Sequence, residues 1–413
     1  MKKKKIGIVT TWFERGAAYV SKQFKEVWEQ EHEVFIYARG GEDIAKLNRE
    51  WNKGNITYGK RFNFSNLDLI DLKQFKEWIL SNNLDIVFFN EQHLWKPVLL
   101  CHDLKVKTGA YIDYYTKQTV PFFELYDFVV CNTHRHFKIF DWHPNPFYIP
   151  WGTDTKLYNK QQQKKTSKNE IVFFHSAGMN PYRKGCDYVI RAFSQLKFQK
   201  AKLIIHTQTK ITNFFPELTQ EINELKKRGK LEIIEKTVPA PGLYYLGDIY
   251  VYPSRLEGIG LTIAEASACG MPVITTNTAP MNEFVKSNIN GKLVKVKSQK
   301  KRNDGYYWDE SEIDLEDLKN QMQFYVDNIK LLDQFKDDSY SFAHTNLSWQ
   351  KNSNYLLSLV HEVGNLEFKE KDVIYDVIKK HEASRGLYFY IANTKIYRNL
   401  KRFFINTIKR LSL

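Results

Sequence analysis

The stretch DIYVYPSRLEGIGLTIAEASACGMPVIT, residues 248–275, decides the fold of this chain. It contains two short apolar runs, Ile249–Tyr252 and Pro272–Thr275, each with the length and composition of a buried strand. Between them a helical pattern runs from Leu261 to Cys269. Strand, loop, helix and strand in this order predict one βαβ unit, and therefore a parallel sheet.

The loop of this unit is rich in glycine. Gly258 and Gly260 flank Ile259, so the backbone there can approach a ligand closely. The helix that begins at Leu261 presents its free N–H groups and the positive end of its dipole to whatever lies in front of it. The pattern predicts an anion site.

Two carboxylates frame the predicted anion site. Glu257 precedes the glycines, and Glu265 lies on the first turns of the helix. A carboxylate would repel a bound phosphate, so its presence here indicates that it faces hydroxyl groups. It can accept two hydrogen bonds from a vicinal diol. A ribose or a sugar ring offers such a diol.

The composition of the whole chain bounds its class. The chain has 413 residues, 43% of them hydrophobic, which predicts two domains, each with its own core. Lys and Arg number 61 against 47 Asp and Glu, a formal charge of +14. This charge favours anionic partners such as nucleotides, nucleic acid or an acidic membrane surface, and does not choose among them.

Cysteine usage and the amino terminus predict a cytoplasmic protein. The cysteines show neither a CxxC pair nor metal-ligand spacing, which favours buried free thiols in a reducing compartment; they are Cys101, Cys131, Cys186 and Cys269. The start MKKKKIGIVTTWF has a charged region, but its apolar run is only as long as a strand. No stretch approaches the roughly 20 apolar residues of a membrane-spanning helix.

Strands and helices alternate through residues 1–155, which predicts a first doubly wound, Rossmann-like domain. Gly16, at the start of the first helix, is expected at the carboxyl edge of the first strand, where ligands of such sheets bind. The expected strands are 5–10, 34–37, 86–89, 108–112, 128–131 and one ending near 150.

A second alternation over residues 170–345 predicts another Rossmann-like domain, with strands at 171–175, 202–206 and 231–235 besides the opening unit. The polar segment 159–169 is the linker candidate. Two such sheets facing one another would leave a cleft between their strand ends. Residues 297–311 read as an irregular surface loop, followed by helices at 315–329, 331–343 and 349–363.

Residues 346–413 are expected to be C-terminal helices, the last of them (about 385–413) basic and amphipathic. Apolar residues from Ile396 to Leu411 share one helical face, and basic residues share the opposite one. Such a helix could lie on an anionic membrane surface, which would make the protein peripheral on the inner face of the membrane. Docking on the rest of the protein with a solvated basic face is the equal alternative.

The segment PSRLEGIGLTIAEASACGMPVITT resembles family 4 of the retaining glycosyltransferases, which have the GT-B architecture of two facing Rossmann-like domains. Glu257 and Glu265 are separated by seven residues, as in the paired-glutamate motif of that family, with EGxGL and GxPVI in register. HSAGMNPYRKGCDYVIRAF, PWGTDTKLY and APMNEFVKSNINGKLV are similar to other segments of the family, in the same order. The resemblance covers residues 1–363, most strongly in the second half.

The resemblance implies a role for each site residue. Glu265 would bind the ribose of a nucleotide sugar, Glu257 would lie beside the donor sugar, and Arg183 and Lys184 would neutralise the diphosphate leaving group. The backbone around Ile259, Gly260 and Leu261, next to Gly258, would contact sugar or phosphate, and Glu283 is a further candidate for sugar contact. The family needs no divalent ion, so no metal and no cofactor are expected.

Two positions depart from the family pattern. The family commonly has an Arg after the glycine of the strand that opens this domain, where this chain has Met179, so Arg183 is the candidate substitute. A family His at the end of a first-domain strand, near the donor sugar, has Asp113 roughly in its place, and His93 is the nearest imidazole in sequence. The resemblance makes residues 1–155 the acceptor-side domain, so either residue could line the acceptor side, and Asp113 is a candidate catalytic residue.

The sequence thus predicts an enzyme that moves a hexose, with retention, from a nucleotide diphosphate sugar to a hydroxyl of a glycan or lipid-linked acceptor. A sugar-nucleotide epimerase of similar architecture is the second hypothesis. A non-enzymatic nucleic-acid-binding protein is the third, suggested only by the charge, and it lacks a recognised module.

Overall fold

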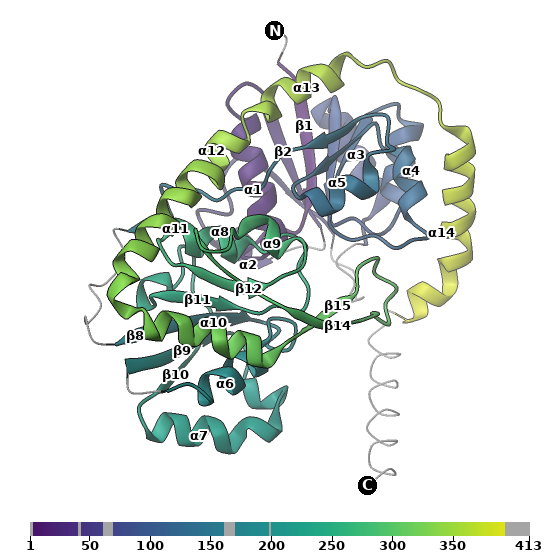
Figure 1. The fold of residues 1–413 in the computed structure, drawn as a ribbon. Helices are drawn as coiled ribbons and strands as arrows, with labels where there is room; N and C mark the ends of the chain where they lie inside the picture. Colours follow the sequence, from purple (N-terminus) through teal and green to yellow (C-terminus); the bar gives the residue numbers. More distant parts are fainter. Residues whose placement is uncertain (1–2, 40–42, 61–68, 161–169, 198–199, 393–413) are drawn as a thin grey trace, which may run out of the picture. The chain divides into compact units, whose positions relative to one another are not determined.

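The computed structural model describes residues 3–39, 43–60, 69–160, 170–197 and 200–392 (Figure 1). The chain divides into two compact units. The first comprises Met1–Cys131, His136–Tyr148 and Tyr355–Leu413, and the second comprises Asn132–Arg135 and Ile149–Asn354. The sequence placed boundaries near 155 and 346, whereas the chain enters the second unit for most of its length at Ile149 and returns to the first at Tyr355.

The first unit contains a seven-stranded parallel sheet in the order β3-β2-β1-β4-β5-β6-β7. The apolar run of β1 is buried because helices cover both faces of such a sheet. The strand order reverses between β1 and β4, which is the switch point of a doubly wound fold. The strands are β1 (Lys5–Thr10), β2 (Glu33–Ala38), β3 (Asn55–Tyr58), β4 (Ile86–Asn90), β5 (Lys107–Tyr111), β6 (Phe128–Cys131) and β7 (Pro146–Tyr148).

Helices from both ends of the chain belong to this unit. The early ones are α1 (Gly16–Trp28), α2 (Asp43–Leu47), α3 (Leu72–Asn82), α4 (Lys96–Asp103) and α5 (His134–Phe140), and the late ones are α13 (Tyr355–Asn365) and α14 (Asp372–Ala392). Helix α13 lies against α1, where the Trp28 indole N–H donates to the Leu356 carbonyl at 3.0 Å (Figure 1). Helix α14 packs against α4. The last helices are therefore part of the first unit.

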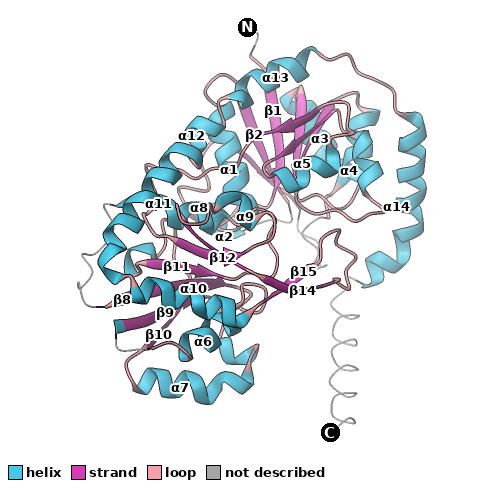
Figure 2. Cartoon of the chain, in the orientation of Figure 1, coloured by secondary structure: helices cyan, strands magenta, loops and turns pink. Residues whose placement is uncertain are grey.

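The second unit repeats the same topology. Its six parallel strands have the order β10-β9-β8-β11-β12-β13, so the switch point lies between β8 and β11. The strands, drawn in magenta in Figure 2, are β8 (Ile171–Gly178), β9 (Ala201–Thr207), β10 (Leu231–Glu235), β11 (Ile249–Tyr252), β12 (Val273–Thr276) and β13 (Gly291–Val294). Two parallel-sheet, Rossmann-like α/β units and a helical C-terminal region confirm the predicted fold class.

The core of the second unit joins its sheet to its helices. Helix α6 (Cys186–Ser194) contacts both α7 (Thr219–Lys227) and α10 (Leu315–Asp327), and their apolar residues share one core with β8 and β9. Helix α8 (Leu261–Ala268) packs against α11 (Leu332–Asn346), where Ser267 and Ser339 exchange a hydrogen bond at 2.9 Å. Asp248, fully buried at the start of β11, is paired with the Lys336 ammonium of α11 at 3.0 Å.

The structure corrects the prediction for residues 297–311. An irregular loop is wrong, because β14 (Val296–Lys300) and β15 (Glu310–Ile313) form an antiparallel hairpin. The side chains of β14 are polar and mostly exposed, so the strand has no apolar alternation to reveal it. Backbone pairing supports it, and the Ser311 amide also donates to the Arg255 carbonyl at 2.8 Å.

Other differences from the predicted elements lie near the C-terminus. The helix expected over 349–363 is broken into α12 (Trp349–Asn352) and α13. The linker candidate lies outside the described residues from 161 onward, and so does the predicted amphipathic segment from 393 onward. Within the part of the chain that the structure describes, no helix has both the length and the apolar character needed to cross a membrane.

Candidate active site

The candidate site forms at the carboxyl ends of β8 and β11, beside the switch point of the second sheet. The chain leaves β8 at Gly178 and reaches Arg183 and Lys184 just before α6, while Glu257 follows the end of β11. Gly185, which precedes α6, has φ +73°, and a Cβ atom there would lie 2.2 Å from the Pro253 carbonyl oxygen. Only glycine allows the two loops to lie this close, so the Lys-Gly pair fixes the two cations against the β11 loop.

The carboxylate of Glu257 is the centre of this site. It is 5% exposed, and it accepts hydrogen bonds from the Arg183 guanidinium at 2.9 Å and the Lys184 ammonium at 2.7 Å. The hydroxyls of Ser254 and Tyr252 donate to the same carboxylate at 2.5 and 2.8 Å. The structure therefore brings together three residues that the sequence singled out.

The charges of this group are strongly coupled. Burial by itself would raise the pKa of Glu257, but Arg183 and Lys184 outweigh it and lower the pKa to about 2. Burial, together with the adjacent Arg183 charge, lowers the pKa of Lys184 to about 8, against the pull of Glu257. Two partly exposed cations, with side chains 31% (Arg183) and 15% (Lys184) exposed, share a single buried carboxylate and so have charge to offer to an anion, such as a phosphate.

The glycine loop opens α8 as predicted. Gly260 is the N-cap of α8 and has φ +90°, a conformation that glycine adopts without strain. Ile259 is buried, whereas Gly258 and Leu261 are half-buried. The Ile263 amide bonds to the Gly260 carbonyl at 2.9 Å, and the N–H groups that precede it at a helix start lack the intrahelical acceptors of later turns, so this end of α8 suits an anion or a polar ligand group.

Two tyrosines that the sequence did not single out hold Glu265. The Tyr244 hydroxyl, in a short 3-10 helix (Tyr244–Leu246), donates to the Glu265 carboxylate at 2.6 Å, and the Tyr158 hydroxyl also bonds to it. Burial raises the pKa of Glu265, and both hydroxyls act in the opposite direction. The two tyrosines therefore orient this carboxylate and favour its ionised form.

The Glu283 carboxylate bonds to the start of α5 and not to Arg183 or Lys184. It sits on the short helix α9 (Met281–Phe284), and its carboxylate accepts from the amides of His134 and Arg135 at 2.6 and 2.9 Å. The Arg135 guanidinium donates to the carbonyl oxygens of Glu257 and Ala279. Sequence reasoning missed Arg135, because an Arg on the first turn of a helix carries no distinguishing signal.

The remaining predicted residues belong to the first unit. Gly16 is exposed on the first turn of α1, and Asp113 follows the end of β5. The Asp113 carboxyl is hydrogen-bonded to Glu91, which follows β4 and has a left-handed φ of +53°. The Arg39 guanidinium, 1% exposed, donates to the Glu91 carbonyl at 2.5 Å. The ring of His93 lies 4.7 Å from the Tyr114 ring.

The Glu91–Asp113 pair predicts a pH-dependent stability. Burial, and then the Asp113 charge, raise the pKa of Glu91 to about 8. The folded state therefore holds a proton that the unfolded chain has lost above its ordinary pKa near 4.5. The free energy of unfolding should fall as pH rises from about 5 to 8, by about 2 kcal/mol for this partly solvent-screened pair.

Urea unfolding across this pH range checks the prediction. Glu91→Gln keeps a hydrogen-bond donor toward Asp113 and removes the titration, so its unfolding midpoint should depend less on pH than that of the wild type. Glu77→Gln, at an exposed position of α3, is the matched control and should keep the wild-type slope. An unchanged slope in Glu91→Gln would refute the shared proton.

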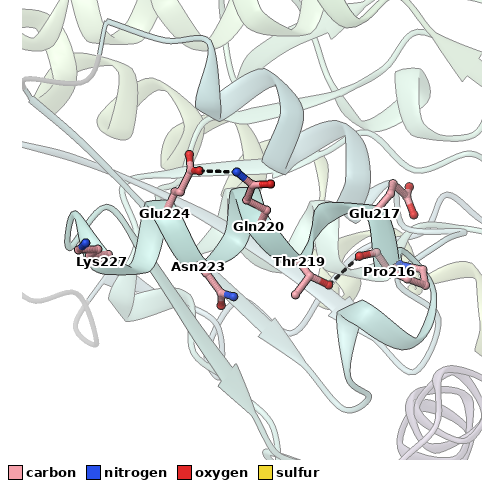
Figure 3. Close-up of a pocket in the computed structure, with 7 residues that line it drawn as sticks. All are labelled: Pro216, Glu217, Thr219, Gln220, Asn223, Glu224 and Lys227. Carbon is pink, nitrogen blue, oxygen red and sulfur yellow. Dashed lines mark hydrogen bonds between the residues drawn. The ribbon is translucent and has the colours of Figure 1, made fainter.

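A separate depression lies on the outer face of α7 (Figure 3). Its volume is about 530 Å³, and its walls are the side chains of Pro216, Glu217, Thr219, Gln220, Asn223, Glu224 and Lys227. Gln220 donates to Glu224 at 3.0 Å, and the Thr219 hydroxyl donates to the Pro216 carbonyl at 2.6 Å. The polar groups bond along one helix, and the depression contains none of the site residues named above.

The comparisons with known proteins match the half of the chain that carries the site. The model of the family "Glycosyl transferases group 1" matches residues 157–306, which include Glu257, Glu265, Arg183 and Lys184. An uncharacterized glycosyltransferase of Methanocaldococcus jannaschii is 30% identical over 149 residues, 36% of this chain and 37% of the relative. The chain therefore spans little more than a third of the length of this curated relative.

Solved structures share the fold of most of the chain. A glycosyltransferase from Rickettsia africae has a TM-score of 0.71 at 17% identity, over 89% of this chain and 100% of that one. An Anabaena protein solved with UDP and glucose has a TM-score of 0.67 at 15% identity, over 87% of this chain and 100% of that one. At these identities the likeness establishes the fold. Residues 157–306 are thus a glycosyl transferases group 1 domain, within a chain whose two Rossmann-like units share the fold of solved glycosyltransferases.

Proposed function

We propose that this protein is a retaining glycosyltransferase, which moves a hexose from a nucleotide diphosphate sugar to a hydroxyl group. The observation that carries the proposal is the buried Glu257 carboxylate paired with the partly exposed cations Arg183 and Lys184 at the carboxyl ends of β8 and β11, inside the matched domain. An enzyme of this class must bind a diphosphate and stabilise negative charge on it, and two fixed cations at a sheet edge serve that need.

The two cations act on the leaving group. As the bond between the sugar and the diphosphate breaks, charge builds on the departing phosphate oxygen. Arg183 and Lys184, held in place by Glu257, stabilise that charge without reorganisation. Fixed cations make a divalent metal unnecessary for this step, so transfer should persist in a chelator.

The remaining groups bind the donor. Glu265, oriented by Tyr244 and Tyr158, accepts two hydrogen bonds from the ribose diol, and the amides at the start of α8 bind sugar or phosphate. Glu257 lies beside the sugar. The acceptor hydroxyl then attacks from the face that the leaving group vacates, which retains the configuration at the anomeric carbon.

The acceptor is proposed to be a glycan or a lipid-linked sugar. A basic C-terminal segment would suit an acceptor held at an anionic membrane surface, with the enzyme on its cytoplasmic side. The carboxyl edge of the first sheet, with Asp113 and Glu91 hydrogen-bonded there, offers acceptors for the hydroxyls of a sugar.

A screen of nucleotide sugars tests the proposal. Donors that bind the folded protein should raise its melting temperature, because they stabilise the native state by mass action. The best donor should then release nucleotide diphosphate when glycan or lipid-linked acceptors are added, with or without EDTA, and NMR of the product should show the donor's anomeric configuration. A product with inverted anomeric configuration would refute the retaining mechanism. If no nucleotide sugar raised the melting temperature, the proposed function would be refuted.

The same assay separates the alternatives. An epimerase would convert the nucleotide sugar when no acceptor is present, and product analysis of that reaction shows it. A nucleic-acid-binding protein would bind DNA or RNA with an affinity that falls steeply with salt. Donor-dependent transfer, with neither of these results, is the outcome that the proposal requires.

A further inference from the structure

We propose that Glu31, His32 and His361 form a metal site for Zn²⁺ in the first unit, where α13 packs against α1. The ligand atoms that these three side chains offer all lie within 4.8 Å of one another. The Nε2 atom of His361 is 3.3 Å from the Glu31 carboxylate, and the two imidazole rings are 5.0 Å apart. This separation requires only small side-chain movements to reach metal bonding distances near 2 Å.

The donor set suits zinc. Two imidazole nitrogens and one carboxylate oxygen are three of the four ligands of a tetrahedral Zn²⁺, and they leave one position for water. The side chain of Glu31 is 51% exposed, which leaves a path for the ion and for that water. Other divalent ions of the same series, such as Ni²⁺ and Cu²⁺, would compete for these ligands.

His32 supplies the second observation. It is 2% exposed, and among the described residues its Nε2 atom has no hydrogen-bond partner, although Nδ1 accepts a long 3.5 Å hydrogen bond from the Lys4 amide. A buried imidazole nitrogen without a partner carries a free-energy cost. Coordination through Nε2 would give that atom a partner. The ring proton would then move to Nδ1, which could no longer accept from the Lys4 amide.

The charge state of His32 also fits a ligand. Burial, and then the neighbouring His361, lower its pKa, and Lys3 and Lys4 act in the same direction while Glu31 opposes them. Burial therefore favours the neutral ring, which is the form that binds a metal. The two lysines repel a cation as well, so Glu31 is needed to offset them.

The position of the site gives the metal a structural role. Glu31 and His32 lie just after α1, whereas His361 lies on α13, 330 residues from Glu31. A metal bound by all three would join the returning C-terminal segment to the first unit, and metal bridges that close long loops stabilise the folded state. This role is separate from transfer chemistry, for which no metal is proposed.

Titration of the full chain with Zn²⁺, after removal of metal with EDTA, tests the site. Calorimetry should give one Zn²⁺ per chain at this site, and a melting temperature that rises with Zn²⁺ concentration. Co²⁺ should show the visible absorption of a tetrahedral complex. Glu31→Gln and His361→Gln, whose native side chains are 51% and 16% exposed, should each weaken binding at least about tenfold.

A matched control is His102→Gln. His102 lies 3.9 Å from Glu370, another His–Glu pair, here between helix α4 and the segment before α14. In the described part of the chain, no third ligand group lies close enough to complete a metal site there. This variant should bind Zn²⁺ as the wild type does. The proposal is overturned if the wild type binds no Zn²⁺, or if Glu31→Gln and His361→Gln bind it with unchanged affinity. Because none of the three zinc ligands is a donor-binding residue, either of these outcomes would overturn the zinc site and leave the proposed glycosyltransferase function untouched.

Discussion

Glu265→Ala is expected to lower the affinity for the nucleotide-sugar donor at least about 100-fold. A carboxylate that accepts two hydrogen bonds from a ribose diol contributes about 1.5–3 kcal/mol through each of them, and 3 kcal/mol corresponds to roughly two orders of magnitude in Kd. The tyrosine hydroxyls that now bond to Glu265 would also lose their acceptor, so the variant would leave two donors unpaired beside the ribose. Isothermal calorimetry with the donor found by the screen measures the loss.

Two further variants separate donor binding from folding. Glu265→Gln keeps the shape of the side chain and an acceptor for one tyrosine, so it should fold normally while it still loses most of the affinity. Glu224→Gln, on the exposed face of α7, is the matched control and should bind the donor as the wild type does. Unchanged affinity of Glu265→Ala for every nucleotide sugar would disprove the assigned role of Glu265.

Tyr158 and Tyr244 show why this part of the site could not be predicted. The ordered spacing of Glu257, the glycines and Glu265 indicates a local loop and helix. Such local patterns can be recognised from the sequence alone. Which distant side chain meets Glu265 depends on how the chain before β8 and the segment before β11 fold back, and that is decided by tertiary packing. A tyrosine in either segment looks like any other core aromatic.

The same distinction applies to the fold. The strands β1, β6, β10 and β11 have the bounds that their apolar runs predicted, because parallel strands are buried on both faces. The hairpin β14–β15 was not predicted because backbone pairing stabilises it, and its polar side chains show no alternating pattern of a strand. The return of α13 to the first unit likewise depends on tertiary packing, in which residues such as Leu356 and Leu359 are buried.

Glu257 gains a second role from the structure. The resemblance gave it a place beside the donor sugar, which stays a prediction. Its contacts with Arg183 and Lys184 add that it holds the two cations in position and neutralises one of their charges. Because Glu257 is buried, removing its partners has a cost for folding as well as for catalysis, and an experiment on the cations must separate the two.

Replacing Arg183 and Lys184 together with Gln is expected to lower kcat by at least about 10³-fold, because one fixed group that stabilises developing negative charge can by itself contribute about 10²–10³. The KM for the donor should change less. The variant should also lose about 3 kcal/mol of stability, because Glu257 is left as an uncompensated buried carboxylate. Steady-state kinetics at a temperature where the variant remains folded, with urea unfolding alongside, measures both effects.

Adding Glu257→Gln to this double variant distinguishes chemistry from folding. The triple variant has no buried charge left unpaired, so it should regain most of the lost stability, while kcat stays low because the cations are still missing. Lys227→Gln with Arg228→Gln removes two adjacent exposed cations at the end of α7 and should leave kcat unchanged. Near-normal kcat in the first double variant would mean that neither cation stabilises the leaving group, and recovery of kcat in the triple variant would mean that the loss came from folding.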